Sequence, residues 1–182
     1  MAETGSLFLN NILTNNIVFI SLWGIVLLIL EADNLRKSYI KGMKISAGLL
    51  ISMLLGWIFS AWFGGQLHVD LLLFWLSSFM GIFFLYQTGV LHGDWQNMPR
   101  IVVALAPFTG IQWSAFEQGV AYFERIYVIG GVVVGFYLAF VLTAAVREQL
   151  KISELPQFLR KEPLLLITMG FFALALLGFG FI

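Results

Sequence analysis

Two short polar stretches inside otherwise apolar sequence hold the residues with the clearest capacity for chemistry. The first contains Asn15 and Asn16, and the second contains Thr109 and Gln112. Amide and hydroxyl groups surrounded by hydrocarbon need hydrogen-bond partners, because leaving them unpaired there is costly. Their oxygen atoms, with backbone carbonyls freed nearby, are suited to line a path for Na⁺ or H⁺. A plainer hypothesis stays open, in which these side chains only hold neighbouring helices together.

Helix breaks are expected at both stretches. Pro107 cannot donate a backbone hydrogen bond and disfavours a straight helix, and Gly110 follows it. The asparagines interrupt the other stretch in a similar way. We therefore predict that the helices over residues 12–30 and 101–115 are each broken or kinked.

The composition indicates that these elements lie in lipid. Hydrophobic residues make up 60% of the 182 residues and charged residues 11%, against about 25% charged residues in a typical soluble domain. The formal net charge is zero, which gives no electrostatic support to nucleic-acid binding. The chain has no cysteine, so disulfides, thiolate-bound iron–sulfur clusters and cysteine zinc sites are excluded.

We predict an all-α integral membrane protein with six transmembrane helices in a single domain over residues 1–182. About 20 apolar residues are needed to cross the hydrocarbon layer. The stretches that meet this condition, or nearly so, cover residues 12–30, 45–63, 71–90, 101–115, 126–146 and 164–182. An alternative, in which the fourth stretch is a re-entrant loop, would leave five spans and would separate the basic loops.

The basic residues set the predicted orientation. Nine of the ten Lys and Arg residues lie in the first, third and fifth loops, and Arg125 alone lies elsewhere. Because basic loops stay in the cytoplasm, the odd loops are predicted to be cytoplasmic and both termini outside. The nine residues are Arg36, Lys37, Lys41, Lys44, Arg100, Arg147, Lys151, Arg160 and Lys161.

Six spans divide into two sets of three, and an odd number makes any repeat inverted across the membrane. We predict one repeat over residues 7–92 and another over residues 99–182. Transporters built in this way bind their substrates on discontinuous helices at matching places in the two halves. Here the first helix of each repeat is the interrupted one.

Several motifs resemble one family of membrane proteins. Residues 147–156 read REQLKISELP, followed by Arg160; residues 15–18 read NNIV, with Gly24 beyond them; and residues 107–109 read PFT. With the basic segment at 36–38, these resemble the small six-helix subunits of Rnf-type ferredoxin:NAD oxidoreductases and Nqr-type sodium-translocating NADH:quinone oxidoreductases. The branch containing the A-type subunits of Rnf and the E-type subunits of Nqr is the most similar. The resemblance extends along nearly the whole chain, and the 147–156 motif is its most specific part.

The resemblance also identifies what this chain lacks. It implies a cysteine on each of the two interrupted helices, with a pair of such subunits holding an iron–sulfur cluster. Those two positions read Val26 and Trp113 here, and Gln112 stands for the asparagine before the second cysteine. Neither valine nor indole can ligate iron. We therefore predict that this chain binds no cofactor, and that iron–sulfur or flavin groups belong to partner subunits.

The resulting hypothesis is a membrane subunit of an Rnf/Nqr-like electron-transport or ion-translocating complex. It acts as a scaffold or as part of an ion path, in the inner membrane of a bacterium or archaeon, beside a second six-helix homologue. It is not catalytic alone, and is a non-redox part of a larger oxidoreductase or translocase. Two alternatives are a small transporter or channel that reuses the fold, and an accessory subunit of another membrane complex.

Two histidines are too isolated to indicate a metal or haem site. His68 lies in the second loop and His92 in the third, so the predicted topology puts them on opposite faces of the membrane. Axial ligation requires a histidine that faces a pocket in the bundle. Solvated side chains are the simpler interpretation of both.

Overall fold

The described part of the chain is entirely helical. The computed structural model describes residues 2–20, 23–31, 35–63, 67–90, 98–118, 121–152 and 162–178. Their regular elements are α1 (Ala2–Ile12), α2 (Ile17–Ile20), α3 (Ile25–Glu31), α4 (Leu35–Phe63), α5 (Leu67–Gln87), α6 (Met98–Phe116), α7 (Arg125–Ile152) and α8 (Glu162–Gly178).

Three of these helices are long and apolar enough to cross a membrane. They cover Leu35–Phe63, Val69–Gln87 and Arg125–Leu150, and a shorter apolar helix covers Pro163–Leu176. Their outer surfaces keep large hydrophobic side chains exposed, among them Trp62 at 80% and Phe171 at 67%. Water would not tolerate such a surface, whereas lipid does. The all-α membrane class predicted from composition is therefore confirmed.

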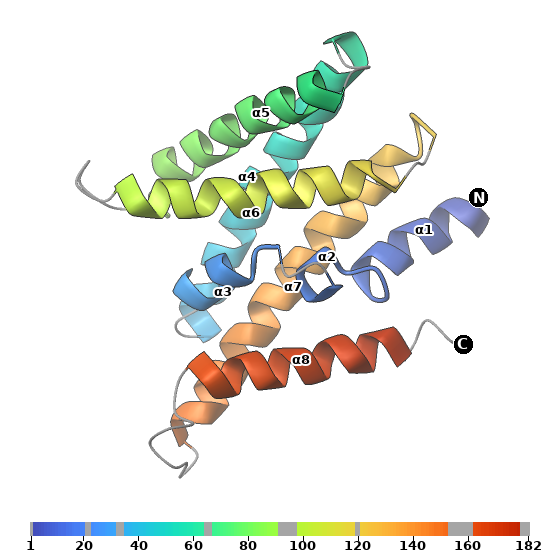
Figure 1. Ribbon diagram of the computed structural model, residues 1–182. Helices are drawn as coiled ribbons and strands as arrows, with labels where there is room; N and C mark the ends of the chain where they lie inside the picture. The colour runs from blue at the N-terminus through green and yellow to red at the C-terminus, as the bar shows by residue number, and fades with distance from the viewer. Residues whose placement is uncertain are drawn as a thin grey trace.

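The helix ends gather on two sides of the bundle (Figure 1). α3, α5 and α7 end on one side, where α4, α6 and α8 begin. The start of α1 and the end of α8 lie on the opposite side, near the junctions of α4 with α5 and of α6 with α7. Polar contacts join neighbouring ends on the first side. Lys41 pairs with Glu31, and the Lys44 Nζ donates to the Thr88 carbonyl at 2.9 Å.

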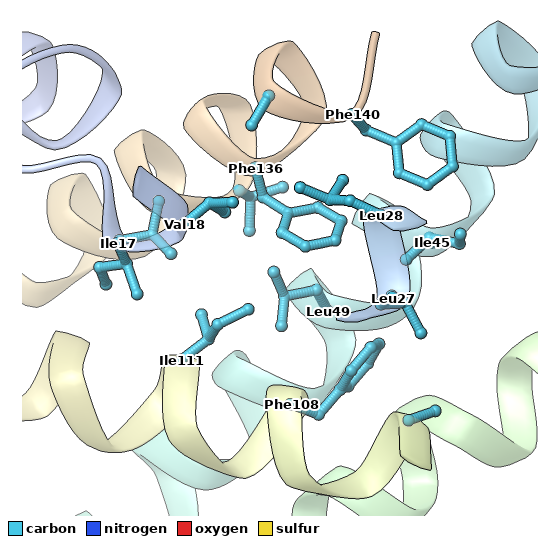
Figure 2. Packing of buried hydrophobic residues seen from close by; sticks show 14 of the residues in the cluster. Ile17, Val18, Leu27, Leu28, Ile45, Leu49, Phe108, Ile111, Phe136 and Phe140 are labelled. Carbon is cyan, nitrogen blue, oxygen red and sulfur yellow. The ribbon is translucent and has the colours of Figure 1, made fainter. Parts of the chain in front are cut away.

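Small residues let the long helices approach closely. A Cβ placed on Gly81 of α5 would stand 2.7 Å from the Gly48 carbonyl oxygen of α4, and one on Gly42 would stand 2.7 Å from the Phe140 ring. Close backbone approach of this kind is how membrane helices gain packing energy without a hydrophobic driving force. The core between them is made largely of Ile, Leu, Val and Phe side chains (Figure 2).

Residues 12–30 do not form one helix. α1 ends at Ile12, the four-residue α2 begins at Ile17, and α3 begins at Ile25 after Trp23 and Gly24. Gly24 has φ +90°, a left-handed conformation that side chains rarely adopt, and a Cβ there would come 3.0 Å from the Phe136 ring. This division agrees with the predicted discontinuity, although the helical segment begins ten residues earlier than residue 12.

The 101–115 helix is not divided as residues 12–30 are, and a kink at Pro107 or Gly110 stays a prediction. α6 runs as one helix from Met98 to Phe116 with Pro107 inside it. Pro107 is buried, and membrane helices tolerate proline where neighbouring helices and Ser or Thr hydroxyls compensate for the lost backbone bond. The Thr109 hydroxyl donates to the Leu105 carbonyl at 2.9 Å in this turn. Gly110 serves packing, because the Trp23 indole lies directly against it and leaves no room for a Cβ.

Candidate functional site

Asn16 joins the broken first segment to α7. Its side chain is 2% exposed, and its Oδ1 accepts from the Val18 backbone N–H at 3.1 Å, as an N-cap of α2 does. Its Nδ2 donates to the Ile12 carbonyl at 2.9 Å and to the Gly135 carbonyl at 3.1 Å. One side chain thus pairs the end of α1, the start of α2 and the middle of α7.

Glycines of α7 make this junction possible. A Cβ on Gly131 would stand 2.8 Å from the Phe8 carbonyl oxygen, and one on Gly135 would stand 2.9 Å from the Asn16 Nδ2. α1 therefore lies against the bare backbone of α7. A second buried amide joins α1 to the end of α6: Asn11 is 1% exposed, and its Oδ1 accepts from the Gln118 Nε2, just beyond α6, at 2.7 Å.

Gln112 is the centre of a separate polar cluster between α4, α5 and α6. It is fully buried. Its Nε2 donates to the Ser52 hydroxyl and, at 2.9 Å, to the Ser78 hydroxyl, while its Oε1 accepts from Ser77 at 2.8 Å. Thr109 donates to Ser78 at 3.3 Å. We call these five residues the Gln112 cluster.

The Gln112 cluster satisfies its own polar groups. Both amide donors and the amide oxygen of Gln112 are paired, and the Ser78 hydroxyl continues to the Phe74 carbonyl at 2.8 Å. A Cβ on Gly56 would stand 2.5 Å from the Gln112 Oε1, so α4 packs against the amide without a gap. These contacts fix the rotation of α6 relative to α4 and α5.

The structure brings together only some of the residues predicted to line a polar path. Thr109 and Gln112 share Ser78 as a partner. Asn16 bonds instead to the junction of α1, α2 and α7, and Asn15 is exposed. The Asn16 junction and the Gln112 cluster are therefore two separate polar groups of residues, whereas the sequence predicted that these residues would face each other.

Hydrocarbon fills the space between the two groupings. α3 and α6 pack on each other, and Leu27 and Leu28 of α3 belong to the same buried hydrophobic cluster as Phe108 and Ile111 of α6 (Figure 2). All four side chains are at most 3% exposed. These are the two helices on which the resemblance implies cysteines, and their contact is packed as an apolar core.

The residues at this place do not fit an iron–sulfur cluster. Val26 lies on α3, although its side chain is outside the described part of the structure. The Trp113 Nε1 donates to the Glu117 Oε1 at 2.7 Å, and its ring lies edge-on to Phe74 of α5 at 6.3 Å. No group of three His, Cys, Asp or Glu side chains able to hold a metal occurs among the described residues. The two histidines do not change this: the His68 side chain and all of His92 lie outside them.

The serines of the Gln112 cluster were not predicted from the sequence. Ser52, Ser77 and Ser78 are all fully buried. A serine inside an apolar helix is a common residue with little local signal, because its hydroxyl can also bond back to its own helix. The adjacent pair at 77 and 78, opposite a glutamine in the next span, is the one sequence feature that could have indicated them.

Fold and site together define an all-helical membrane protein with two buried polar junctions and an apolar centre. The chain is 38% identical over 71 residues to the A-type subunit of the ion-translocating oxidoreductase complex of Syntrophotalea carbinolica, covering 39% of this chain and 37% of that protein. It is 22% identical over 188 residues to the A-type subunit of the proton-translocating ferredoxin:NAD(+) oxidoreductase complex of Clostridium ljungdahlii, covering 99% of this chain and 97% of that protein.

A third relative is the corresponding subunit of another such complex. The A-type subunit of the Na(+)-translocating ferredoxin:NAD(+) oxidoreductase complex of Acetobacterium woodii is 43% identical over 71 residues, covering 39% of this chain and 37% of that protein. No family model matches the chain. Its homologues are nevertheless the A-type subunits of Rnf-type complexes, which confirms the resemblance drawn from the motifs.

Proposed function

We propose that this chain is a scaffold subunit of an Rnf-like ion-translocating electron-transport complex, and that it holds no iron–sulfur cluster. The observation that carries the proposal is the apolar packing between α3 and α6. Phe108, Ile111, Leu27 and Leu28 are buried on the two helices that carry Val26 and Trp113, the positions at which the resemblance implies cysteines, and the chain has no cysteine. Similarity over nearly the full length of one A-type relative supports the partnership.

The packing pattern supports six spans arranged as two inverted repeats, with α1–α3 together forming the first span. α2 contacts α7 and α8, while α6 contacts α4 and α5, so the first span of each half packs on the second and third helices of the other half. The middle helices α4 and α7 pack on each other. A pseudo-twofold axis in the membrane plane exchanges these contacts.

The distribution of charge supports the orientation. Arg36, Lys37, Lys41 and Lys44 lie in the first half of α4, and Arg147 lies near the end of α7, all toward the same side of the bundle. The positive-inside rule makes that side cytoplasmic and leaves the start of α1 and the end of α8 outside. We therefore propose a multi-pass protein of a prokaryotic cell membrane with both termini outside.

The geometry favours a scaffold over an ion path. Polar groups on an ion path in hydrocarbon face a shared interior or water-filled cavity. The amide oxygens of Asn16 and Gln112 instead accept hydrogen bonds from Val18 and Ser77. The apolar packing between α3 and α6 likewise argues against a transporter that binds its solute between these two helices.

The proposed partners are the other membrane subunits of such a complex, including a second six-helix homologue. Two relatives are named as parts of proton-translocating and Na(+)-translocating complexes. Whether this chain's complex moves H⁺ or Na⁺ depends on those other subunits if the chain is a scaffold.

Affinity purification of the tagged chain from its native membrane tests the proposal. We expect it to co-purify with flavin- and iron–sulfur-containing subunits. The chain expressed and purified alone should contain no stoichiometric iron and should give no iron–sulfur signal in electron paramagnetic resonance. An iron–sulfur signal from the isolated chain would overturn the proposal, as would co-purification with only unrelated proteins.

Because the chain contains no cysteine, labelling of a single introduced cysteine tests the proposed topology. Phe123→Cys, at a position 81% exposed, should react with a membrane-impermeant maleimide on intact cells. Lys37→Cys should react only after the cells are permeabilised. The reverse pattern would show that the proposed orientation is wrong.

A further inference from the structure

A charged cavity lies at the end of the bundle opposite the basic side and is used by neither polar junction. Its volume is about 210 Å³, the share of roughly seven water molecules in the liquid. It lies where α4 ends, α5 begins, α6 ends and α7 begins. The lining residues are Ser60, Asp70, Phe74, Trp113, Phe116, Glu117 and Arg125.

Two carboxylates of this cavity each have one oxygen fixed and one free. The Ser60 hydroxyl donates to the Asp70 Oδ1 at 2.9 Å, and the Trp113 Nε1 donates to the Glu117 Oε1 at 2.7 Å. Within the described residues the second oxygen of each carboxylate accepts no hydrogen bond. Both carboxylates are therefore oriented while keeping an acceptor for a ligand.

The Arg125 guanidinium, which is the positive charge of the cavity, also has donors left for a ligand. The Arg125 guanidinium carbon lies 4.9 Å from the centre of the Phe116 ring, and its buried Nε has no hydrogen-bond partner. In the described part of the chain it forms no ion pair with Asp70 or Glu117, although all three groups line the same cavity. A buried donor without a partner is uncommon in native structures, and this one lies at a cavity where a ligand could accept its hydrogen bond.

We propose that this cavity binds a small zwitterion, with an anionic group on Arg125 and an ammonium group on Asp70 and Glu117. An anion alone would face two carboxylates, and a cation alone would face the guanidinium. A molecule with both charges satisfies both ends, and the rings of Phe74, Phe116 and Trp113 give its short hydrocarbon chain an apolar wall. Because Glu117 lines the cavity and is exposed, a ligand can reach the cavity from the water on that side of the membrane.

A binding series on the purified full chain tests this proposal independently of the complex to which the chain belongs. The zwitterions glycine, β-alanine and γ-aminobutyrate differ in charge separation, and butyrate and butylamine are singly charged controls. Isothermal titration in detergent should find at least one zwitterion that binds about tenfold more tightly than either control, because each charge-assisted bond contributes at least that factor. Equal binding of a singly charged control would overturn the proposal, as would absence of zwitterion binding up to roughly 10 mM.

Variants assign the binding to this cavity. Arg125→Gln and Asp70→Asn should each lower the affinity for the tightest-binding zwitterion by about tenfold or more. Ser60→Ala is a milder change and should lower that affinity less. Glu124→Gln changes a carboxylate on the same side that does not line the cavity, and should leave binding unchanged. Binding that survives both Arg125→Gln and Asp70→Asn would place the ligand elsewhere.

Discussion

Asn16 lies between α1 and α2 and Gln112 lies in α6, and the hydrogen bonds of these two buried amides end on different kinds of group. Among the described residues, the Asn16 side chain bonds to backbone atoms, at Ile12, Val18 and Gly135. Within the same set, the Gln112 side chain bonds to the side chains of serines on neighbouring helices. The chain is discontinuous around Asn16 and continuous through Gln112.

The difference shows what a buried amide does in each case. Where a helix stops inside a membrane, its terminal N–H and C=O groups lose their partners, and a side chain must replace them. Where the helix continues, those groups are already paired, and the amide is free to bond across the bundle. The same kind of side chain therefore completes a break in one half and joins helices in the other.

Removing Gln112 should have the largest effect. Gln112→Ala leaves the hydroxyls of Ser52 and Ser77 without this partner and opens a cavity beside Gly56. We expect the free energy of unfolding to fall by about 3 kcal/mol, from the cavity and from three lost hydrogen bonds in hydrocarbon. Unfolding of the purified chain in mixed micelles with increasing SDS measures this.

The control for Gln112 is Gln87→Ala, because Gln87 is exposed at the end of α5. We expect it to change stability by less than about 0.5 kcal/mol. Equal effects of the two substitutions would mean that the Gln112 cluster does not hold α6 in place.

Adding one methyl group at the α1–α7 contact should have the next largest effect. Gly131→Ala places a Cβ 2.8 Å from a backbone oxygen of Phe8, which cannot move alone. We expect a loss of about 1–3 kcal/mol, as for other overpacked sites. Gly170→Ala on α8 is the matched control, since nothing lies within 4 Å of its Cβ position, and it should not lower stability in the same unfolding experiment. A neutral Gly131→Ala would show that α1 is not seated against α7.

Asn16→Ala should cost less than Gln112→Ala because the Gly135 carbonyl lies inside α7 and keeps its intrahelical hydrogen bond, so the loss falls on the groups at Ile12 and Val18. We expect a loss of about 1–2 kcal/mol, the range for an N-cap residue. Thermal unfolding of the purified chain measures it beside Asn15→Ala. Asn15 is the exposed neighbour, so its substitution should stay below about 0.5 kcal/mol. If Asn15→Ala were the more damaging change, the assignment of the junction to Asn16 would be wrong.

Pro107→Ala should have the smallest effect. The change restores a backbone donor inside a helix that is already continuous, while it loses part of a buried ring. These two contributions oppose each other, so the net change should be less than about 1 kcal/mol in either direction. Loss of more than roughly twice that amount, by the same thermal unfolding, would indicate that Pro107 sets a bend that the neighbouring helices require.

The sequence by itself determined the class of the protein and the lack of any thiol in it. Long apolar stretches, few charges and basic residues gathered in alternate loops are local or compositional properties, and they predicted an all-α membrane protein without reference to packing. The missing thiols at Val26 and Trp113 are equally a property of the residues alone. The asparagines likewise indicated the discontinuity before α2.

Only the tertiary structure decided which groups those polar residues would meet. The partners of Gln112 lie 34 to 60 residues away along the chain, and which face of each helix meets the next depends on rotation and crossing angle, which no local pattern encodes. The sequence indicates a break at Pro107 because proline visibly lacks a backbone N–H donor. The groups on neighbouring helices that compensate for this missing donor cannot be identified from the sequence. For the same reason the cavity of Asp70, Glu117 and Arg125 could not be predicted, because its charges come together from separate helices only after the bundle has formed.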